Sequence, residues 1–78
     1  MALADNVAQN VLATREAKGL TQSALAKKVK ISVSYVSMLE RGLRVPPLET
    51  LEALAKALGV PPLDLLQKPA SKVRRGRK

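Results

Sequence analysis

Apolar residues along the chain recur at intervals of three and four positions, and glycines and prolines separate the stretches that carry this spacing. Such spacing is typical of helices that bury one face, whereas half-buried strands show strict alternation. It predicts no strand, and it predicts helices over residues 5–18, 22–29, 32–41, 48–58 and 62–67. The sequence therefore predicts an all-α fold.

Polar residues and a glycine mark the ends of the first three helices. Asn6 and Gln9 lie three positions apart and can form a capping box at the start of the first helix. Thr21 and Ser32 are expected to be the N-caps of the second and third helices, because a hydroxyl oxygen accepts a hydrogen bond from a free backbone N–H. Gly19 is expected to end the first helix in a left-handed conformation.

The fourth helix has the most regular apolar pattern in the chain. Its inward face is predicted to consist of Leu48, Leu51, Leu54, Ala55 and Leu58. Pro47 precedes this helix, and proline suits a first helical turn although it offers no side-chain cap. The core should be aliphatic, because Tyr35 is the only aromatic residue in the sequence.

Positive charge is concentrated near the C-terminus. Residues 1–67 contain eight basic and six acidic residues, a net charge of +2, whereas residues 68–78 contain six basic residues and no acid. A chain of 78 residues is too short for two domains. We therefore expect one domain over residues 1–67, followed by a short, disordered and flexible basic tail over residues 68–78.

Residues that the chain lacks exclude several classes of protein. Without cysteine or histidine, disulfides, thiol chemistry and the usual zinc sites cannot form, and no enzyme, metal, cofactor or small-molecule substrate is predicted. Asp5 stands where a secretory signal would need positive charge, and no apolar run approaches the roughly 20 residues of a membrane span. We expect a cytoplasmic protein that does not enter a membrane.

The second and third helices are short and joined by only a few residues, which suits a helix-turn-helix as well as an ordinary small bundle. The residues themselves are more specific. Residues 19–60, GLTQSALAKKVKISVSYVSMLERGLRVPPLETLEALAKALGV, closely resemble the lambda-repressor/Cro-like (Xre) helix-turn-helix family, most of all in SMLERG at 37–42 and in Arg15 four positions before Gly19. The resemblance covers roughly residues 7–66. It implies a compact five-helix Cro/repressor-like domain that binds duplex DNA and regulates transcription, associated with the nucleoid.

By this resemblance, residues 32–41 form the recognition helix that enters the major groove. Base contacts would come from Val33, Ser34, Ser37 and Met38. None of these is Arg, Asn or Gln, so the strongest hydrogen-bonding code for bases is missing. We predict that Val33 and Met38 contact thymine methyl groups, and that the shape of the operator adds discrimination.

Contacts to the DNA backbone would surround this helix. The residues expected to make them are Thr21, Gln22, Tyr35, Arg41 and Arg44. Gln22 lies in the first turn of its helix, where backbone N–H groups and a side-chain amide can hold a phosphate, and a solvated cap is the alternative. Tyr35 can instead pack within the domain, and both arginines can be solvated.

The resemblance also bears on an ion pair and on the conformation of one turn residue. Arg15 and Glu40 would form an ion pair that links the first helix to the end of the recognition helix, and two independent surface charges are the alternative. Lys30 occupies the turn position at which the family usually has a left-handed glycine. We therefore predict a positive φ at Lys30, at a cost of roughly 1 kcal/mol or more.

The partners implied are double-stranded DNA and a second copy of the chain. A homodimer would read a palindromic operator, with Leu63 and Leu66 predicted at the contact between the two copies.

The tail can add affinity through counterion release or can only aid solubility; the residues concerned are Lys72, Arg74, Arg75, Arg77 and Lys78. Controller proteins of restriction-modification systems and small phage-type repressors have similar blocks. An antitoxin of the same fold, or a protein-interaction module of the transcription machinery, is the alternative function.

Overall fold

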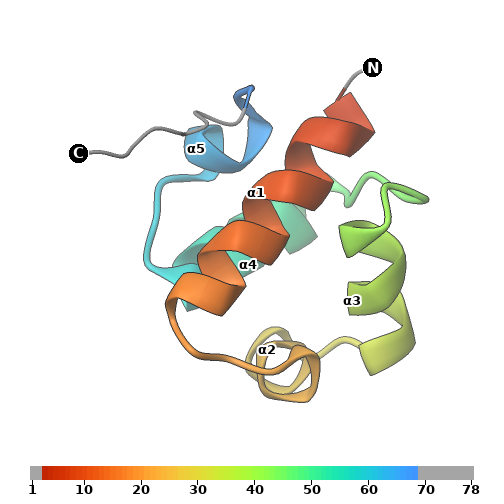
Figure 1. The fold of residues 1–78 in the computed structure, drawn as a ribbon, viewed down its shortest axis with the longest axis vertical. Helices are drawn as coiled ribbons and strands as arrows, with labels where there is room; N and C mark the ends of the chain where they lie inside the picture. The colour runs from red at the N-terminus through yellow and green to blue at the C-terminus, as the bar shows by residue number, and fades with distance from the viewer. Residues whose placement is uncertain (1–2, 69–78) are drawn as a thin grey trace.

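The computed structural model describes residues 3–68, and this part of the chain folds into five α-helices without a strand (Figure 1). The helices are α1 (Leu3–Ala17), α2 (Gln22–Val29), α3 (Val33–Glu40), α4 (Leu48–Leu58) and α5 (Pro62–Leu66). The predicted all-α fold is confirmed. No helix within residues 3–68 combines the length and the apolar character that crossing a membrane requires.

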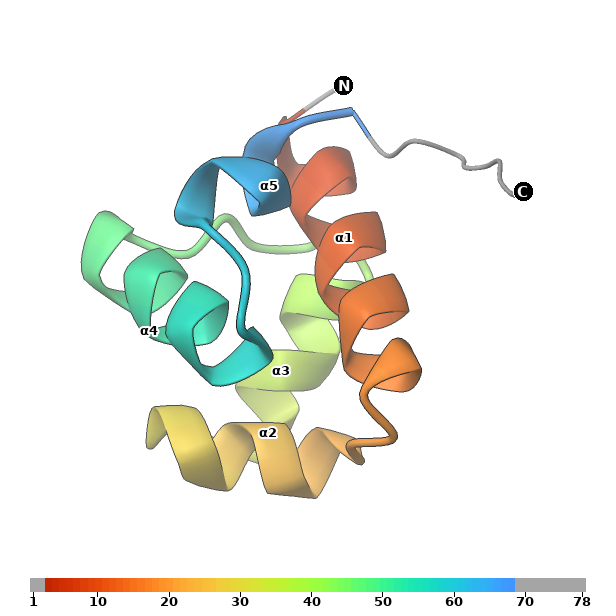
Figure 2. The ribbon, with the colours of Figure 1, turned by 90° about the vertical axis from the view of Figure 1, so that its left-hand side faces the viewer.

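The aliphatic core lies where the helices meet. α1 packs against α3 and α5, α2 packs against α3 and α4, and α5 covers α4 (Figures 1 and 2). Each helix contributes at least one side chain that is almost wholly buried, and the largest of these are Val7, Val11, Leu25, Val36, Leu39, Leu54, Leu58 and Leu65. Because each buried Val or Leu contributes roughly 1.5–3 kcal/mol, this cluster accounts for the arrangement of the helices.

One member of the predicted stripe on α4 does not reach the core. Leu48 is 67% exposed, whereas Leu51, Leu54, Ala55 and Leu58 are buried as predicted. Leu48 is the first residue of α4 and follows Pro47, so it stands at the edge of the domain, beyond the helices that cover the rest of the stripe. Pro47 caps the helix with no side-chain hydrogen bond, as expected.

The predicted local signals at α2 and α3 are confirmed. The hydroxyl oxygen of Thr21 accepts a hydrogen bond from the backbone N–H of Ala24 at 3.0 Å. The hydroxyl oxygen of Ser32 accepts one from the backbone N–H of Tyr35 at 3.0 Å. Gly19 has φ +71° at the end of α1, the left-handed conformation that glycine adopts most readily.

The predicted capping box at Asn6 and Gln9 is wrong, because α1 already begins at Leu3 and both residues lie inside it. The asparagines of α1 bind the end of α5 instead. The Asn10 amide donates to the backbone oxygens of Leu65 at 3.0 Å and Gln67 at 2.7 Å, and the Asn6 amide donates to that of Leu66 at 3.3 Å. The last carbonyls of a helix have no partner within it, and these amides supply one.

This clamp predicts a loss of stability when Asn10 is changed. Asn10→Ala should lower the free energy of unfolding by about 1–2 kcal/mol, because two hydrogen bonds are removed and the Leu65 carbonyl is partly buried. Urea denaturation measures the change. Gln9→Ala is the matched control on the exposed face of α1, and it should shift stability by less than about 0.5 kcal/mol. Equal effects of the two substitutions would contradict the clamp.

Candidate nucleic-acid interface

A three-residue turn, residues 30–32, joins α2 to α3. Lys30 has φ 66° and ψ 43°, so the predicted positive φ is confirmed. The backbone N–H groups of Lys30 and Ile31 both donate to the Ala26 oxygen, the latter at 3.0 Å, which closes the end of α2. Ala26 is 3% exposed, and the half-buried Ile31 packs against the core. The turn therefore fixes the angle at which α2 and α3 cross.

One face of α3 is open to solvent. Val36 and Leu39 are fully buried and fix which side faces inward. On the other side Val33 is 43% exposed and Ser34 is exposed, while Ser37 and Met38 are half-buried. Two of the four residues predicted to read bases thus protrude, and the other two present only part of their side chains. This face can offer apolar contacts and hydroxyl groups.

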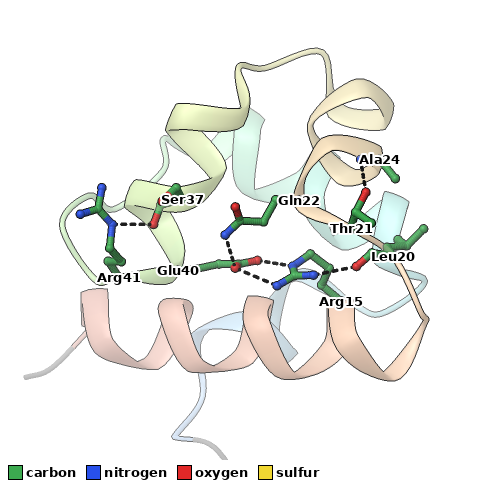
Figure 3. A network of polar contacts seen from close by, with 8 residues as sticks. All are labelled: Arg15, Leu20, Thr21, Gln22, Ala24, Ser37, Glu40 and Arg41. Carbon is green, nitrogen blue, oxygen red and sulfur yellow. Dashed lines mark hydrogen bonds and ion pairs between the residues drawn. The ribbon is translucent and has the colours of Figure 1, made fainter.

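Arg15 and Glu40 form an ion pair that ties α1 to the end of α3. The distance from Nε of Arg15 to Oε2 of Glu40 is 2.6 Å, and Nη2 donates to Oε1 at 3.1 Å, so the contact is bidentate (Figure 3). The side chains are only 11% and 4% exposed. The hydrogen bond to Glu40 raises the pKa of Arg15, against the opposing effect of burial. The alternative of two independent surface charges is wrong.

The network extends to the start of α2. Arg15 donates through Nη1 to the backbone oxygen of Leu20 at 2.6 Å, and the Gln22 amide donates to Oε1 of Glu40 at 2.9 Å (Figure 3). Glu40 therefore accepts three hydrogen bonds, which come from two other helices. The orientation of α3 is fixed relative to both α1 and α2.

Neither role predicted for Gln22, a phosphate contact or a solvated cap, includes the bond to Glu40. The two residues are 18 positions apart, so no local signal in the sequence pairs them. The bond uses one N–H of the amide and leaves a second N–H and the amide oxygen. Contact with a phosphate therefore stays compatible with this geometry.

The other residues predicted to contact the DNA backbone lie around α3. Thr21 is exposed, and its hydroxyl caps α2. Tyr35 is half-buried and packs against the core, which is the alternative stated for it. Arg41 and Arg44 are exposed in the segment between α3 and α4, and Nε of Arg41 donates to the backbone oxygen of Ser37 at 3.4 Å. Both arginines follow closely on the end of α3.

The two residues predicted at the dimer contact differ in exposure. Leu63 is 60% exposed, whereas Leu66 is half-buried and packs against the core. Leu66 therefore offers less surface to a partner than the sequence indicates. The predicted tail contacts at Lys72, Arg74, Arg75, Arg77 and Lys78 lie outside the described residues.

Five helices in this arrangement, with a left-handed turn between α2 and α3 and an exposed face on α3, define a helix-turn-helix domain. A family model described as helix-turn-helix matches residues 11–65. The chain belongs to this family, in its lambda-repressor/Cro-like (Xre) branch.

Named relatives and solved structures agree with this assignment. The immunity repressor protein of Bacillus phage phi105 is 46% identical over 51 residues, which are 65% of this chain and 35% of the repressor. The restriction-modification controller protein C.AhdI from Aeromonas hydrophila is 37% identical with a TM-score of 0.76, covering 80% of this chain and 94% of C.AhdI. SinR, the master regulator for biofilm formation, solved in complex with DNA, is 34% identical with a TM-score of 0.75, covering 78% and 98%.

Proposed function

We propose that the protein is a transcription regulator that binds duplex DNA sequence-specifically by inserting α3 into the major groove. The observation that carries this proposal is the exposed face of α3 at Val33 and Ser34, on a helix that Glu40 holds from two sides. A reading helix must be held rigidly, because base contacts depend on the position of each side chain in the groove. Similarity to a phage repressor, a controller protein and a regulator solved with DNA supports the same role.

Contacts to the DNA backbone would position the protein, and contacts to base edges would read the sequence. The start of α2, with Thr21 and Gln22, lies beside the ion-pair network and can hold a phosphate through its backbone N–H groups. Arg41 and Arg44 can neutralise further phosphates beside the end of α3. Such contacts fix the register of the protein on the duplex and leave the reading of sequence to α3.

Reading by α3 would rely on apolar contact. Val33 is exposed and Met38 is partly exposed, so both can touch the 5-methyl group of thymine, while the hydroxyl groups of Ser34 and Ser37 can donate to or accept from either base of a pair. Each contact is weaker than a bidentate arginine or amide contact. Part of the specificity would then come from the sequence-dependent shape of the operator.

Removal of the thymine methyl groups tests this mode of reading. Replacing thymine by deoxyuridine throughout the half-sites should lower affinity several-fold, because the duplex keeps its hydrogen-bonding groups and loses only the methyl groups. Fluorescence anisotropy with matched duplexes measures the change. Val33→Ala is the companion variant, and the affinities of the two duplexes should differ less for it than for the unaltered protein, because Met38 alone then contacts methyl groups at full strength. Undiminished binding of the deoxyuridine duplex by the unaltered protein would rule the methyl contacts out.

We also propose that two copies bind together on a palindromic operator. α4 and α5 pack against each other and carry two strongly exposed leucines, Leu48 at 67% and Leu63 at 60%. A contact between two copies would remove this apolar surface from water. Dimers of this kind read half-sites about one helical turn, roughly 34 Å, apart.

Selection of bound sequences from random duplex DNA tests the whole proposal. We expect enrichment of an inverted repeat with one helical turn between half-site centres, and two protomers per duplex by sedimentation. Enrichment of a single half-site with one protomer bound would remove the dimer and keep the DNA reader. No enrichment at moderate salt would overturn the proposed function.

One observation favours a second function for the same face. Val33 is exposed and apolar, and the exposed part of α3 carries none of the residues that pair most strongly with bases. An apolar face of this kind also suits a protein partner from the transcription machinery. Competition tests whether DNA and a protein partner use the same face. Duplex DNA added at moderate salt should displace the bound partner if both bind at α3, and should leave it bound if they do not.

A further inference from the structure

The turn between α2 and α3 contains a conformation that the other helix ends reserve for glycine. Among residues 3–68, Lys30 is the one non-glycine residue with a positive φ, at 66°. Gly19, Gly42 and Gly59 adopt the same region at the ends of α1, α3 and α4, with φ between 71° and 77°. A side chain is strained there, and residues strained in this way cluster at functional sites.

Contacts within the domain do not account for a lysine at this position. The side chain of Lys30 is exposed and has no hydrogen bond or ion pair with any residue between 3 and 68. Positive charge does favour the end of a helix, but Lys27 and Lys28 already supply it in the last turn of α2. The ammonium group of Lys30 therefore adds little to folding, and its backbone conformation opposes folding.

The place of the turn indicates what the charge can meet. The turn begins two residues before Ser32, the N-cap of the recognition helix, so it lies beside the end of α3 that carries Val33 and Ser34. α2 lies at one end of the molecule and α5 at the other, as both views of the ribbon show (Figures 1 and 2). If α5 faces the two-fold axis of a dimer on DNA, the turn lies over the outer flank of each half-site.

We propose that Lys30 binds a DNA phosphate on the outer flank of each half-site, beyond the base pairs that α3 reads. This inference rests on the proposed function and on the dimer arrangement with α5 near the axis. A lysine supplies a mobile point charge that suits a phosphate, and such a contact adds affinity without reading sequence. Lys27 and Lys28 are exposed in the last helical turn of α2 and extend the positive surface over the same flank.

Two substitutions at Lys30 separate strain from charge. Lys30→Gly relieves the strained conformation, so we expect the melting temperature to rise by roughly 4–8 °C while the affinity for operator DNA falls several-fold. Lys30→Gln keeps a side chain in the turn and removes only the charge, so it should show the weaker binding without the gain in stability. Opposite changes in stability and affinity are a result that a purely structural role for Lys30 would not give.

Two duplexes that carry the selected operator test the contact with the flank. The longer duplex has several flanking base pairs on each side. The shorter one ends at the outermost base pair of each half-site. The unaltered protein should bind the shorter duplex more weakly, and the slope of log affinity against log salt should fall by about 0.9 for each phosphate that the protein can no longer reach. Lys30→Gln should already show a reduced slope on the longer duplex, and shortening the flank should lower its affinity less than it lowers that of the unaltered protein, because only Lys27 and Lys28 still act there.

Lys56→Gln is the matched control, because Lys56 is exposed on α4 and the substitution changes the net charge by the same amount. Its binding should stay close to that of the unaltered protein. Equal losses of affinity for Lys56→Gln and Lys30→Gln, or unaltered affinity and salt slope for Lys30→Gln on the longer duplex, would overturn the phosphate contact and leave the proposed function standing. A protein that selects no DNA sequence would overturn both.

Discussion

Glu40→Ala is expected to lower the melting temperature by at least about 12 °C. The substitution leaves Arg15 charged, 11% exposed and without its carboxylate, and breaking a buried pair in this way costs about 3–5 kcal/mol. It also removes the acceptor of the Gln22 amide. Thermal unfolding followed by circular dichroism measures the effect. Operator affinity should fall as well, because α3 is no longer held in its orientation.

A double substitution distinguishes the absence of the ion pair from the presence of a stranded charge. In Arg15→Met with Glu40→Leu, no charge is left buried, so stability should recover in large part even though the network is gone. Glu16→Ala, a neighbouring exposed acid on α1, should unfold at nearly the same temperature as the unaltered protein. If Glu40→Ala unfolds within about 2 °C of the unaltered protein, the pair contributes no more than a surface ion pair does.

Val33→Glu is expected to reduce operator affinity by about 100-fold or more while the fold remains intact. Val33 is 43% exposed and is the first residue of α3, so a carboxylate there costs no core packing and interacts favourably with the positive end of the helix. On DNA the same carboxylate would face the phosphates and the acceptor atoms of base edges, and such a like-charge contact costs several kcal/mol. Anisotropy titration and thermal unfolding of the same sample provide both measurements.

Two other variants show whether this loss of affinity is specific to the reading face. Gln9→Glu makes the same change in net charge on the exposed side of α1 and should bind operator DNA within about twofold to threefold of the unaltered protein. Val33→Thr keeps the branched shape and one methyl group, so it should weaken binding far less than the glutamate does. A Val33→Glu protein that binds as tightly as Gln9→Glu would exclude α3 from the groove.

The parts of the fold that the sequence predicts well are those that depend on near neighbours. Thr21 and Ser32 bond to N–H groups three positions away, and Gly19 ends α1 through its own backbone freedom. The positive φ of Lys30 is expected from the resemblance to the family, which usually has a left-handed glycine at this position of the turn. Apolar spacing also identifies the buried faces, since a helix repeats its neighbours every three to four residues.

The parts that the sequence does not predict depend on residues that are distant along the chain. Asn6 resembles a helix cap when only the next four residues are considered, but its partner is the Leu66 carbonyl, 60 positions away. Gln22 and Glu40 belong to different helices, and the Gln22 amide donates to the same Glu40 oxygen that accepts from Nη2 of Arg15. Leu48 continues a regular stripe in sequence, yet the domain ends before the stripe does.

The bonds from Asn6 and Asn10 to the end of α5 also set an order of events during synthesis. Their acceptors lie 55–60 positions downstream, so α1 is synthesised before the carbonyls it binds exist. Synthesis proceeds at about 5–20 residues per second, so several seconds separate the synthesis of the amides from that of their acceptors. The nascent chain therefore cannot close its first helix onto its last until translation of the domain is complete.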